Sequence, residues 1–288
     1  GVQAGEVLDI DRLSRRLRPL LDLKRSDAGE SLADEFELDR ILDKARGWRA
    51  EFGDNIRDTV EILRQAIDDD ARILLEGQLG VMRDLDWGTY PYVTSSTTFA
   101  AGAGSGAGVP PREIRNIVAV VKAYTTAVGA GPLPTEMHGP DATNLRERGH
   151  EYGATTGRPR RVGWLDGVAL RYAAEVGAFS SLAITKLDVL DGMDPVKIAV
   201  AYTVDGHAVE RFPHPSRLDD ARPVYEDLPG WTTPTGNARK LDDLPDNARQ
   251  YVRRIEEIAG VPVSLIGVGE TRDAIIELEG ERPMLAVS

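Results

Sequence analysis

Short apolar runs that alternate with amphipathic segments are the feature that most limits the possible folds of this chain. Apolar runs bounded by turn residues predict strands, and apolar residues at three- and four-residue spacing predict helices. Strands are expected at Ser181–Thr185, Val196–Val204 and 261–266, and helices at 112–125, 164–177 and 244–258. This alternation is typical of an α/β fold with a mainly parallel central sheet flanked by helices. Binding loops are then expected at the carboxyl ends of the strands.

The first seventy residues have a different pattern. Residues 32–52 and 55–70 carry apolar side chains at helical spacing with charges between them, which predicts amphipathic helices packed on a larger body. We therefore expect one domain over residues 1–288, with a peripheral helical region at 1–70 and an α/β part at 71–288. The dipeptide Asp205-Gly206, directly after a predicted strand, indicates a hairpin.

Composition excludes several classes of protein. The formal net charge of −12 argues against a nucleic-acid-binding or membrane-surface protein, and 41% hydrophobic residues suffice for a core. The sequence has no cysteine, which fits a reducing compartment, and we find no signal peptide or long apolar run. A cytoplasmic protein is expected. The four histidines lack metal-ligand spacing and are expected at surface or loop positions: His138, His150, His207 and His214.

Residues 151–161 (EYGATTGRPRR) concentrate two glycines, two threonines and three arginines in one segment of an acidic chain. Glycine allows the backbone to approach a ligand, hydroxyl groups donate hydrogen bonds, and guanidinium groups match carboxylates and phosphates. The segment therefore predicts a loop that binds a small anionic ligand. A solvated basic turn is the alternative.

Two further loops follow predicted strands. Lys186 and Asp188 come directly after the run ending at Thr185, where an aspartate can accept hydrogen bonds from N1 and N2 of guanine while the lysine stem covers the ring. A lysine and an aspartate that merely close a strand are the alternative. Gly267-Val268-Gly269 is either a simple turn or a place where backbone packs against a purine.

Residues 77–111 form a long segment rich in glycine, serine and threonine. Connections of this length are either functional or disordered, and the aromatic residues Trp87, Tyr90 and Tyr92 favour an ordered loop. The clustered hydroxyl groups between residues 89 and 98 suit phosphate recognition, although a polar loop without a ligand has the same composition.

Five motifs occur in the order, and near the spacing, of one known family. They are residues 88–96 (GTYPYVTSS), 131–136 (GPLPTE), 152–166 (YGATTGRPRRVGWLD), 185–192 (TKLDVLDG) and 228–231 (LPGW). Together they make the chain, from Gly1 to about Leu278, resemble adenylosuccinate synthetase. The resemblance implies a P-loop-NTPase-like α/β fold and a ligase of purine nucleotide biosynthesis. Such enzymes use GTP and Mg²⁺ to join IMP and L-aspartate into adenylosuccinate, on the route to AMP, through 6-phosphoryl-IMP.

The resemblance also implies roles for particular residues. Arg160 would lie beside the GTP phosphates, where a fixed cation stabilises charge that develops during phosphoryl transfer. The implied aspartate-binding residues are Ala154, Thr155, Thr156, Gly157, Arg158, Pro159 and Arg160. The implied IMP-binding residues are Gln78, Thr94, Val128 and Arg158. The implied GTP-binding residues are Arg160, Lys186, Leu187, Asp188, Gly267, Val268 and Gly269. Members are usually homodimers.

Other parts of the family pattern are missing. Members carry a glycine-rich phosphate loop with a catalytic aspartate, and further on a catalytic histidine, and neither occurs in residues 1–288. By resemblance we expect the catalytic pair, the magnesium ligands and the phosphate cradle upstream of Gly1. No catalytic residue or metal ligand is therefore assigned within the chain, and we expect the chain by itself to lack turnover.

The nucleotide-binding segment departs from the pattern as well. The family's glutamine falls in register on Leu79, with Gln78 one place early, and Arg83 stands where relatives have an apolar residue. Two alternatives to an IMP ligase stay open. One is a variant ligase that uses another purine nucleotide, such as dGMP. The other is a non-catalytic nucleotide-binding fragment, or a partner within a split enzyme.

Overall fold

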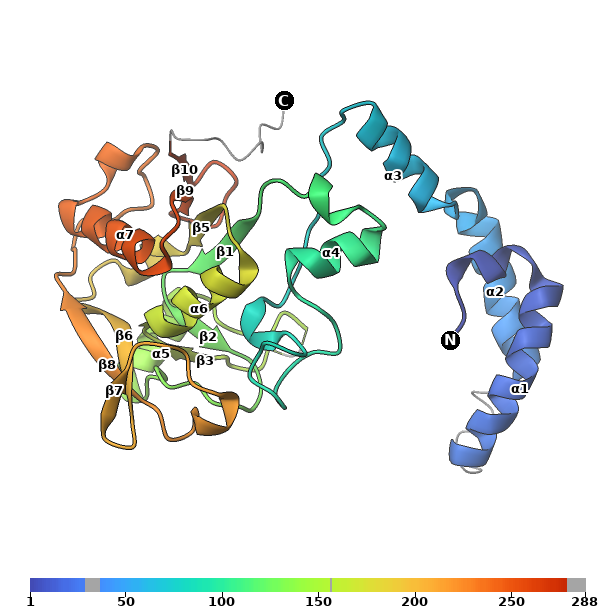
Figure 1. Cartoon of the computed structure of the whole chain (residues 1–288), viewed down its shortest axis with the longest axis horizontal. Helices are drawn as coiled ribbons and strands as arrows, with labels where there is room; N and C mark the ends of the chain where they lie inside the picture. Colours follow the sequence, from blue (N-terminus) through green and yellow to red (C-terminus); the bar gives the residue numbers. More distant parts are fainter. Residues whose placement is uncertain (29–36, 156, 279–288) are drawn as a thin grey trace. The chain divides into compact units, whose positions relative to one another are not determined.

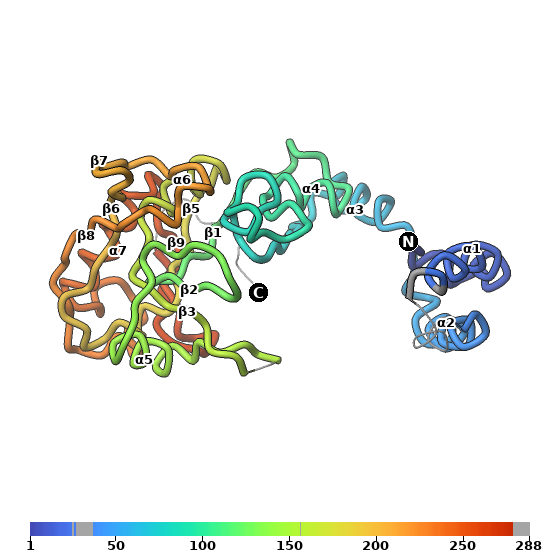
Figure 2. Tube along the Cα trace, turned by 90° about the horizontal axis from the view of Figure 1, so that it is seen from below, coloured from blue at the N-terminus to red at the C-terminus, as the bar shows by residue number. Residues whose placement is uncertain are grey.

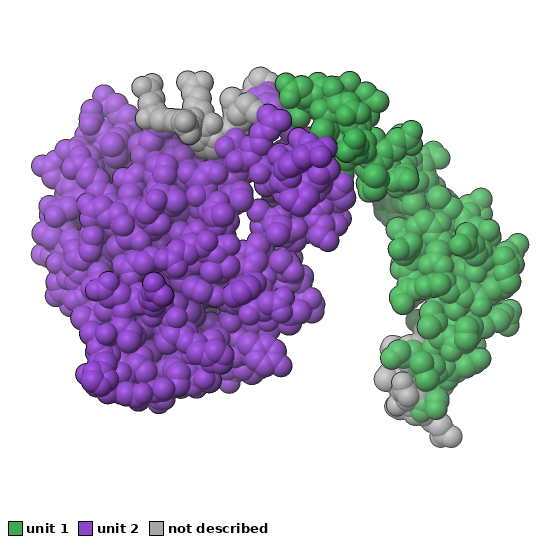
Figure 3. Space-filling view, viewed as in Figure 1, with its two compact units in different colours: residues 1–71 green, residues 72–288 purple. Residues whose placement is uncertain are grey.

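The computed structural model describes residues 1–28, 37–155 and 157–278 (Figure 1). The chain divides into two compact units, Gly1–Ala71 and Arg72–Ser288, which Figure 3 colours separately. In the described residues no helix is both long and apolar enough to cross a membrane.

The first unit is helical. Its elements are the 3₁₀ helix η1 (Ala4–Leu8), the helices α1 (Ile10–Ala28) and α2 (Leu38–Phe52), η3 (Gly53–Asn55), and α3 (Thr59–Asp68). A small core holds α1 and α2 together and is formed by Val7, Leu13, Leu17, Leu21, Leu42 and Ala45. The helices predicted at 32–52 and 55–70 are confirmed as α2 and α3, with residues 32–36 outside the described part.

The second unit is built on a sheet with the order β1-β5-β9-β10. Its strands are β1 (Val118–Lys122), β5 (Ser181–Thr185), β9 (Val263–Gly267) and β10 (Ile275–Glu277). The first three run parallel and β10 is antiparallel to β9. The predicted α/β fold with a mainly parallel sheet is therefore confirmed.

Two smaller sheets complete the strands of this unit. In one, β2 (Thr125–Ala127) pairs with β3 (Arg161–Gly163). In the other, β6 (Val196–Val204) pairs with β4 (Leu165–Asp166), β7 (His207–Val209) and β8 (Arg222–Leu228). The hairpin predicted at Asp205-Gly206 joins β6 to β7, and both turn residues have a positive φ (52° and 79°), as a primed turn requires.

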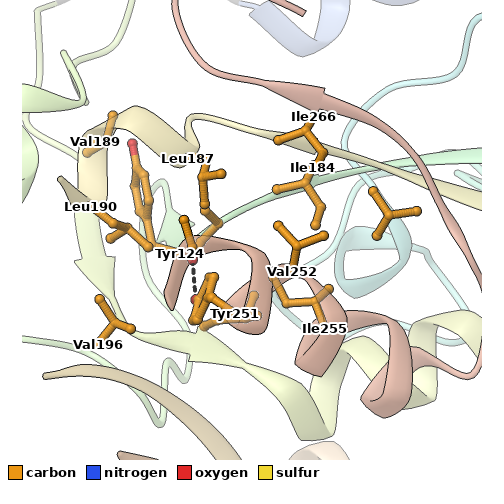
Figure 4. Packing of buried hydrophobic residues seen from close by; sticks show 14 of the residues in the cluster. Tyr124, Ile184, Leu187, Val189, Leu190, Val196, Tyr251, Val252, Ile255 and Ile266 are labelled. Carbon is orange, nitrogen blue, oxygen red and sulfur yellow. Dashed lines mark hydrogen bonds between the residues drawn. The ribbon is translucent and has the colours of Figure 1, made fainter. Parts of the chain in front are cut away.

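Helices and 3₁₀ turns connect these strands. The helices are α4 (Ala100–Ala107), α5 (Gly139–Arg148), α6 (Gly167–Gly177) and α7 (Asp246–Ala259). The 3₁₀ turns are η4 (Val81–Arg83), η5 (Pro111–Glu113), η6 (Leu187–Leu190), η7 (Pro215–Arg217) and η8 (Leu241–Asp243). Side chains from β5, β9, η6 and α7 form the main core (Figure 4), where the hydroxyl of Tyr251 donates to the carbonyl of Ala123 at 2.6 Å.

The helix predicted at residues 112–125 is wrong. The segment contains the end of η5, the strand β1 and the start of β2. The run Val118-Ala119-Val120-Val121 is rich in β-branched residues, which favour a strand, and it pairs along its length with β5. A short apolar run of this kind has the same apolar positions whether it becomes a buried strand or part of a helix.

Smaller corrections concern element boundaries. The helix predicted at 164–177 begins only at Gly167, because Leu165–Asp166 pairs with β6 and Asp166 caps the helix by accepting from the amide of Ala169 at 3.0 Å. The helix predicted at 244–258 is α7, and the strand predicted at 261–266 is β9. Residues 77–111 include α4, which was not predicted because its sequence is rich in glycine. A Cβ on Gly102 would lie 2.5 Å from the carbonyl oxygen of Thr97, so close packing requires glycine there.

Candidate functional site

The carboxyl ends of β1, β5 and β9 lie at one edge of the main sheet. Lys122, the last residue of β1, is in register with Thr185, the last residue of β5. Gly267 ends β9 so close by that a Cβ on it would lie 3.5 Å from the Cα of Thr185. The parallel pairing therefore brings the predicted guanine-binding segments 186–188 and 267–269 together, as expected for strand ends of a parallel sheet.

Lys186 and Asp188 leave this edge in a tight turn. Lys186 has a left-handed backbone (φ 61°) and is the N-cap residue directly before η6. Leu187, between Lys186 and Asp188, is fully buried in the core. Asp188 is half-buried, and burial raises the pKa of its carboxyl group. A carboxylate that is partly removed from water in this way gains from hydrogen-bond donors supplied by a ligand.

The turn at 267–269 has little room for side chains. Val268 is fully buried, and its amide donates to the carbonyl of Ala274 at 2.9 Å. A Cβ on Gly269 would lie 3.0 Å from the Cβ of Ala274. The turn therefore presents mainly backbone at the sheet edge.

The arginine-rich segment forms a narrow hairpin between α5 and β3, which Figure 2 shows extending from the region of α5. Tyr152 and Pro159 form an isolated antiparallel bridge, and the amide of Gly153 donates to the carbonyl of Arg158 at 2.9 Å. Gly157 has a positive φ of 64°, which closes the tip. The exposed tip carries the predicted residues Ala154, Thr155, Gly157, Arg158 and Pro159, and Thr156 lies outside the described residues.

The three arginines of this hairpin have different surroundings. Arg161 pairs with Glu136 through two nitrogens and donates to the carbonyl of Gly131 at 2.6 Å, and its hydrogen bonds lower the pKa of Glu136. Arg160 lies at the base of the hairpin and Arg158 at its exposed tip. Arg161 therefore fixes the hairpin to the fold, Arg160 is partly buried against Glu151, and Arg158 is exposed.

Glu151, at the base of the hairpin, joins it to the sheet edge. Its side chain is 0% exposed. One carboxylate oxygen accepts from Nζ of Lys122 at 2.7 Å and from the hydroxyl of Tyr124 at 2.6 Å, and lies 3.4 Å from Nζ of Lys186. The other oxygen accepts from Nη1 of Arg160 at 2.8 Å. A single carboxylate thus contacts three cations from β1, the end of β5 and the hairpin.

The charge state of this cluster follows from its contacts. Burial alone would raise the pKa of Glu151, but hydrogen bonds from Lys122 and Tyr124 and the charges of Lys122 and Lys186 outweigh it and lower the pKa to about 2. Burial lowers the pKa of Lys122 although Glu151 opposes the shift. Burial and the neighbouring carboxylate raise the pKa of Tyr124. Glu151 is therefore ionised at neutral pH.

Two of the residues predicted to bind IMP, Thr94 and Val128, lie in segments that Arg83 connects. Arg83 donates to the carbonyl of Val128 at 2.9 Å and to that of Tyr92 at 2.6 Å, and its own carbonyl accepts from the amide of Thr94 at 2.8 Å. Arg83 therefore ties Thr94 to Val128. Val128 also follows Ala127, which pairs with Arg161 at the foot of the hairpin.

Gln78 lies in the segment that precedes η4, and its side chain is exposed. The next residue, Leu79, is 57% exposed and has a positive φ of 72°. Thr98 donates through its hydroxyl to the carbonyl of Gly80 at 2.9 Å, which fixes this segment to the far end of the loop.

A buried carboxylate, Asp84, orders this loop. It is 1% exposed and accepts from the amides of Asp86 (3.0 Å), Trp87 (3.1 Å) and Thr98 (2.9 Å). Burial would raise the pKa of Asp84, but these backbone donors outweigh it and the pKa is lowered. A Cβ on Gly88 would lie 2.4 Å from the carbonyl oxygen of Asp84, so the turn requires glycine. The prediction of an ordered loop at 77–98 agrees with these contacts.

Sequence reasoning missed Lys122 and Tyr124, and gave Glu151 no role. The reason is the wrong helix at 112–125: once β1 is known as a strand, Lys122 is a polar residue at a strand end, the same signal that identified Lys186. No comparable signal marks Glu151, because its partners come from distant segments.

Metal-ligating side chains do not gather in the part of the chain that the structure describes. Within residues 1–28, 37–155 and 157–278, no group of three or more His, Cys, Asp or Glu side chains could hold a metal ion. The four histidines are exposed, as predicted: His138, His150, His207 and His214.

Comparison with known proteins identifies the family. The family model of adenylosuccinate synthetase matches residues 1–276. Adenylosuccinate synthetase of Moorella thermoacetica is 46% identical over 285 residues, covering 97% of this chain and 66% of the relative. That of Pelobacter propionicus is 42% identical over 280 residues, covering 96% of this chain and 65% of the relative.

The fold agrees. The structure of fully ligated adenylosuccinate synthetase from Plasmodium falciparum superposes with a TM-score of 0.88 at 33% identity, covering 95% of this chain and 65% of that one. The chain thus spans about two thirds of the length of these relatives. The match over nearly the whole chain confirms the resemblance drawn from the five motifs, and the chain belongs to the adenylosuccinate synthetase family.

Proposed function

We propose that this protein acts in purine nucleotide biosynthesis as an adenylosuccinate synthetase, a carbon–nitrogen ligase that joins L-aspartate to IMP at the expense of GTP. The γ-phosphoryl group of GTP passes to the oxygen on C6 of IMP, and the aspartate amine then displaces that phosphate to give adenylosuccinate. The observation that carries the proposal is the meeting of the lysine–aspartate turn, the glycine turn and the arginine hairpin at one edge of the sheet.

The sheet edge supplies the chemistry for guanine. The carboxylate of Asp188 accepts from N1–H and N2–H of the base, and adenine offers no such pair of donors. The stem of Lys186 covers the ring, and the backbone of Leu187 and of residues 267–269 packs against it. The half-buried state of Asp188 supports this assignment, because an unsatisfied carboxylate there is costly when the wrong base binds.

The arginine hairpin supplies the anion site. Arg158, at its tip, binds the carboxylate of aspartate and also reaches IMP, while Arg160 stabilises charge on the phosphate that is transferred. The backbone and hydroxyl groups of residues 154–157 and Pro159 complete the aspartate loop, with Thr156 included from the sequence alone. Gln78, Thr94 and Val128 bind IMP, which the contacts of Arg83 with the last two segments support.

Mg²⁺ is proposed as the metal that accompanies GTP. Its charge would neutralise the phosphates during transfer. The described residues bring together no cluster that could ligate it, so no residue of this chain is assigned to it. We further propose a homodimer located in the cytoplasm, which light scattering and cell fractionation test directly.

Nucleotide titration of the complete protein tests the guanine assignment. We expect GTP to bind at least about a hundredfold more tightly than ATP by calorimetry, and Asp188→Ala to abolish the preference. Glu270→Gln is the matched control: it removes an exposed carboxylate of the same sheet edge, paired with His150 at 3.7 Å, and the preference should persist. Equal binding of GTP and ATP by the unaltered protein contradicts the assignment.

Turnover is tested separately, by following adenylosuccinate formation from IMP, L-aspartate, GTP and Mg²⁺ with the complete protein. Absence of product with all four components present rejects the proposed reaction.

Two observations favour a second candidate. Arg83 places its guanidinium between the carbonyls of Tyr92 and Val128, within the proposed nucleotide site, and the exposed Leu79 cannot hydrogen-bond a base. Both fit a ligase that accepts a purine nucleotide other than IMP. Comparing IMP with dGMP in the same assay decides between the two, since the better substrate has the higher kcat/KM.

A further inference from the structure

Glu151 has no ligand to bind in the proposed function, yet it contacts two residues that do. Its carboxylate lies 3.4 Å from Nζ of Lys186, on the guanine side, and 2.8 Å from Nη1 of Arg160, on the phosphate side. We propose that Glu151 is a positioning residue that holds Lys186 by an ion pair and Arg160 by a hydrogen bond, so that GTP affinity depends on a carboxylate that touches no part of the nucleotide. This inference rests on the proposed function.

The carboxylate is itself held in place from the opposite side. The hydroxyl of Tyr124 and Nζ of Lys122 donate to the same oxygen of Glu151 at 2.6 and 2.7 Å. Lys122 also donates to the hydroxyl of Thr126 at 2.9 Å, which fixes it to β2. The backbone of Glu151 is fixed too, because its carbonyl accepts from the amide of Arg160 at 2.9 Å. The sheet therefore sets the position of the carboxylate. The carboxylate in turn positions Arg160, and it positions Lys186 together with the carbonyl of Gly149, to which Nζ of Lys186 donates.

Differences in exposure indicate which side chains need the carboxylate of Glu151 to stay in position. The side chain of Glu151 is 0% exposed, whereas those of Lys186 and Arg160 are 35% and 30% exposed. Without the negative charge, three like charges would remain close together. All three side chains are partly exposed, but Lys122 keeps its hydrogen bond to Thr126, whereas Lys186 and Arg160 can turn toward water. Their preferred positions would then no longer match the nucleotide, and ordering them again on binding would cost free energy.

A glutamine at this position tests the proposal. Glu151→Gln keeps the size of the side chain but removes its charge and places an amide N–H₂ among donors. By calorimetry on the complete protein, we expect GTP to bind about tenfold more weakly. Part of the effect should pass through Lys186, so in a Lys186→Met background the same substitution should weaken GTP binding by only about threefold, the remainder passing through Arg160.

A merely structural role predicts a different pattern. It would lower the melting temperature while leaving GTP affinity unchanged, or it would change affinity equally in both backgrounds, and either result overturns the proposal. Glu226→Gln is the matched control, because it breaks a partly buried pair with Arg254, between β8 and α7, that has no contact with Lys186 or Arg160. It should reduce stability and leave GTP affinity unchanged.

A second substitution covers the case in which Glu151→Gln does not fold. Glu151→Asp keeps the charge and shortens the side chain by one methylene, so it tests position alone. Weaker GTP binding by a folded Glu151→Asp protein supports the proposal, and wild-type affinity overturns it. If the unaltered protein binds no GTP, the proposed function fails instead, and the two failures are therefore distinguishable.

Discussion

Two buried carboxylates, Glu151 and Asp84, are satisfied in opposite ways. Asp84 accepts from three backbone amides, all within its own loop. Glu151 accepts from side chains of two distant segments, Lys122 and Tyr124 in one and Arg160 in the other, and lies 3.4 Å from Nζ of Lys186 in a third. Both have a lowered pKa, so charge alone does not distinguish them.

The difference lies in what each carboxylate can control. Backbone amides fix the path of the chain, so Asp84 sets the shape of the 84–98 loop and does not orient a cation. Cationic side chains keep rotatable stems, so Glu151 controls where their charged ends lie. We infer that Asp84 stabilises the backbone of its loop, whereas Glu151 positions the charged side chains of the candidate site.

Removing the charge and hydrogen-bonding capacity of Glu151 should have the largest effect. Glu151→Met leaves Lys122, Lys186 and Arg160 without their shared carboxylate, and we expect the free energy of unfolding to fall by about 4 kcal/mol, measured by urea denaturation. The control is Asp227→Asn, which breaks the exposed pair with Lys197 and should cost less than about 1 kcal/mol. Equal losses would show that burial does not matter.

Acid should remove the contribution of Glu151 progressively. Its pKa is about 2 in the fold and 4.5 as an ordinary glutamate, so its stabilising effect is present above pH 4.5 and is lost as pH falls toward 2. The shift corresponds to about 3 kcal/mol. Urea denaturation of the wild type and Glu151→Gln across this range should therefore give curves that converge. A difference in stability that stays constant with pH would contradict the assignment.

The sequence predicted much of the fold where elements are long or strongly patterned. The strands at Ser181–Thr185 and Val196–Val204 and the helix α7 were expected close to their observed positions. The strand β1 was mistaken for a helix, because a short apolar run between polar residues fits both periods. The helix α4 was missed because its glycines, needed for close packing, are also turn residues. Pairing with distant strands, which decides such cases, is not a local property.

The same distinction between local pattern and distant pairing separates the site residues that were predicted from those that were missed. Residues 186–188, 267–269 and the arginine hairpin were marked by loops of unusual composition after strands, and the parallel sheet brings them together. Lys122 and Tyr124 were missed with β1. The roles of the hairpin residues remain predictions from the resemblance, because residue types alone do not show which ligand atoms they contact. The role of Glu151 could not be predicted from the sequence, because only the fold brings its carboxylate into contact with three cations.

Asp84 should give the smallest effect and complete the comparison. Asp84→Asn keeps one oxygen for the amides of Asp86 and Trp87 but turns an N–H₂ group toward the amide of Thr98. One buried hydrogen bond is then lost, at about 1–2 kcal/mol. Hydrogen exchange should be faster at Thr98 and unchanged at Asp86 and Trp87, with GTP affinity as in the wild type. A loss of GTP affinity as large as that expected for Glu151→Gln would mean that Asp84 also affects GTP binding and that the two carboxylates do not differ in role.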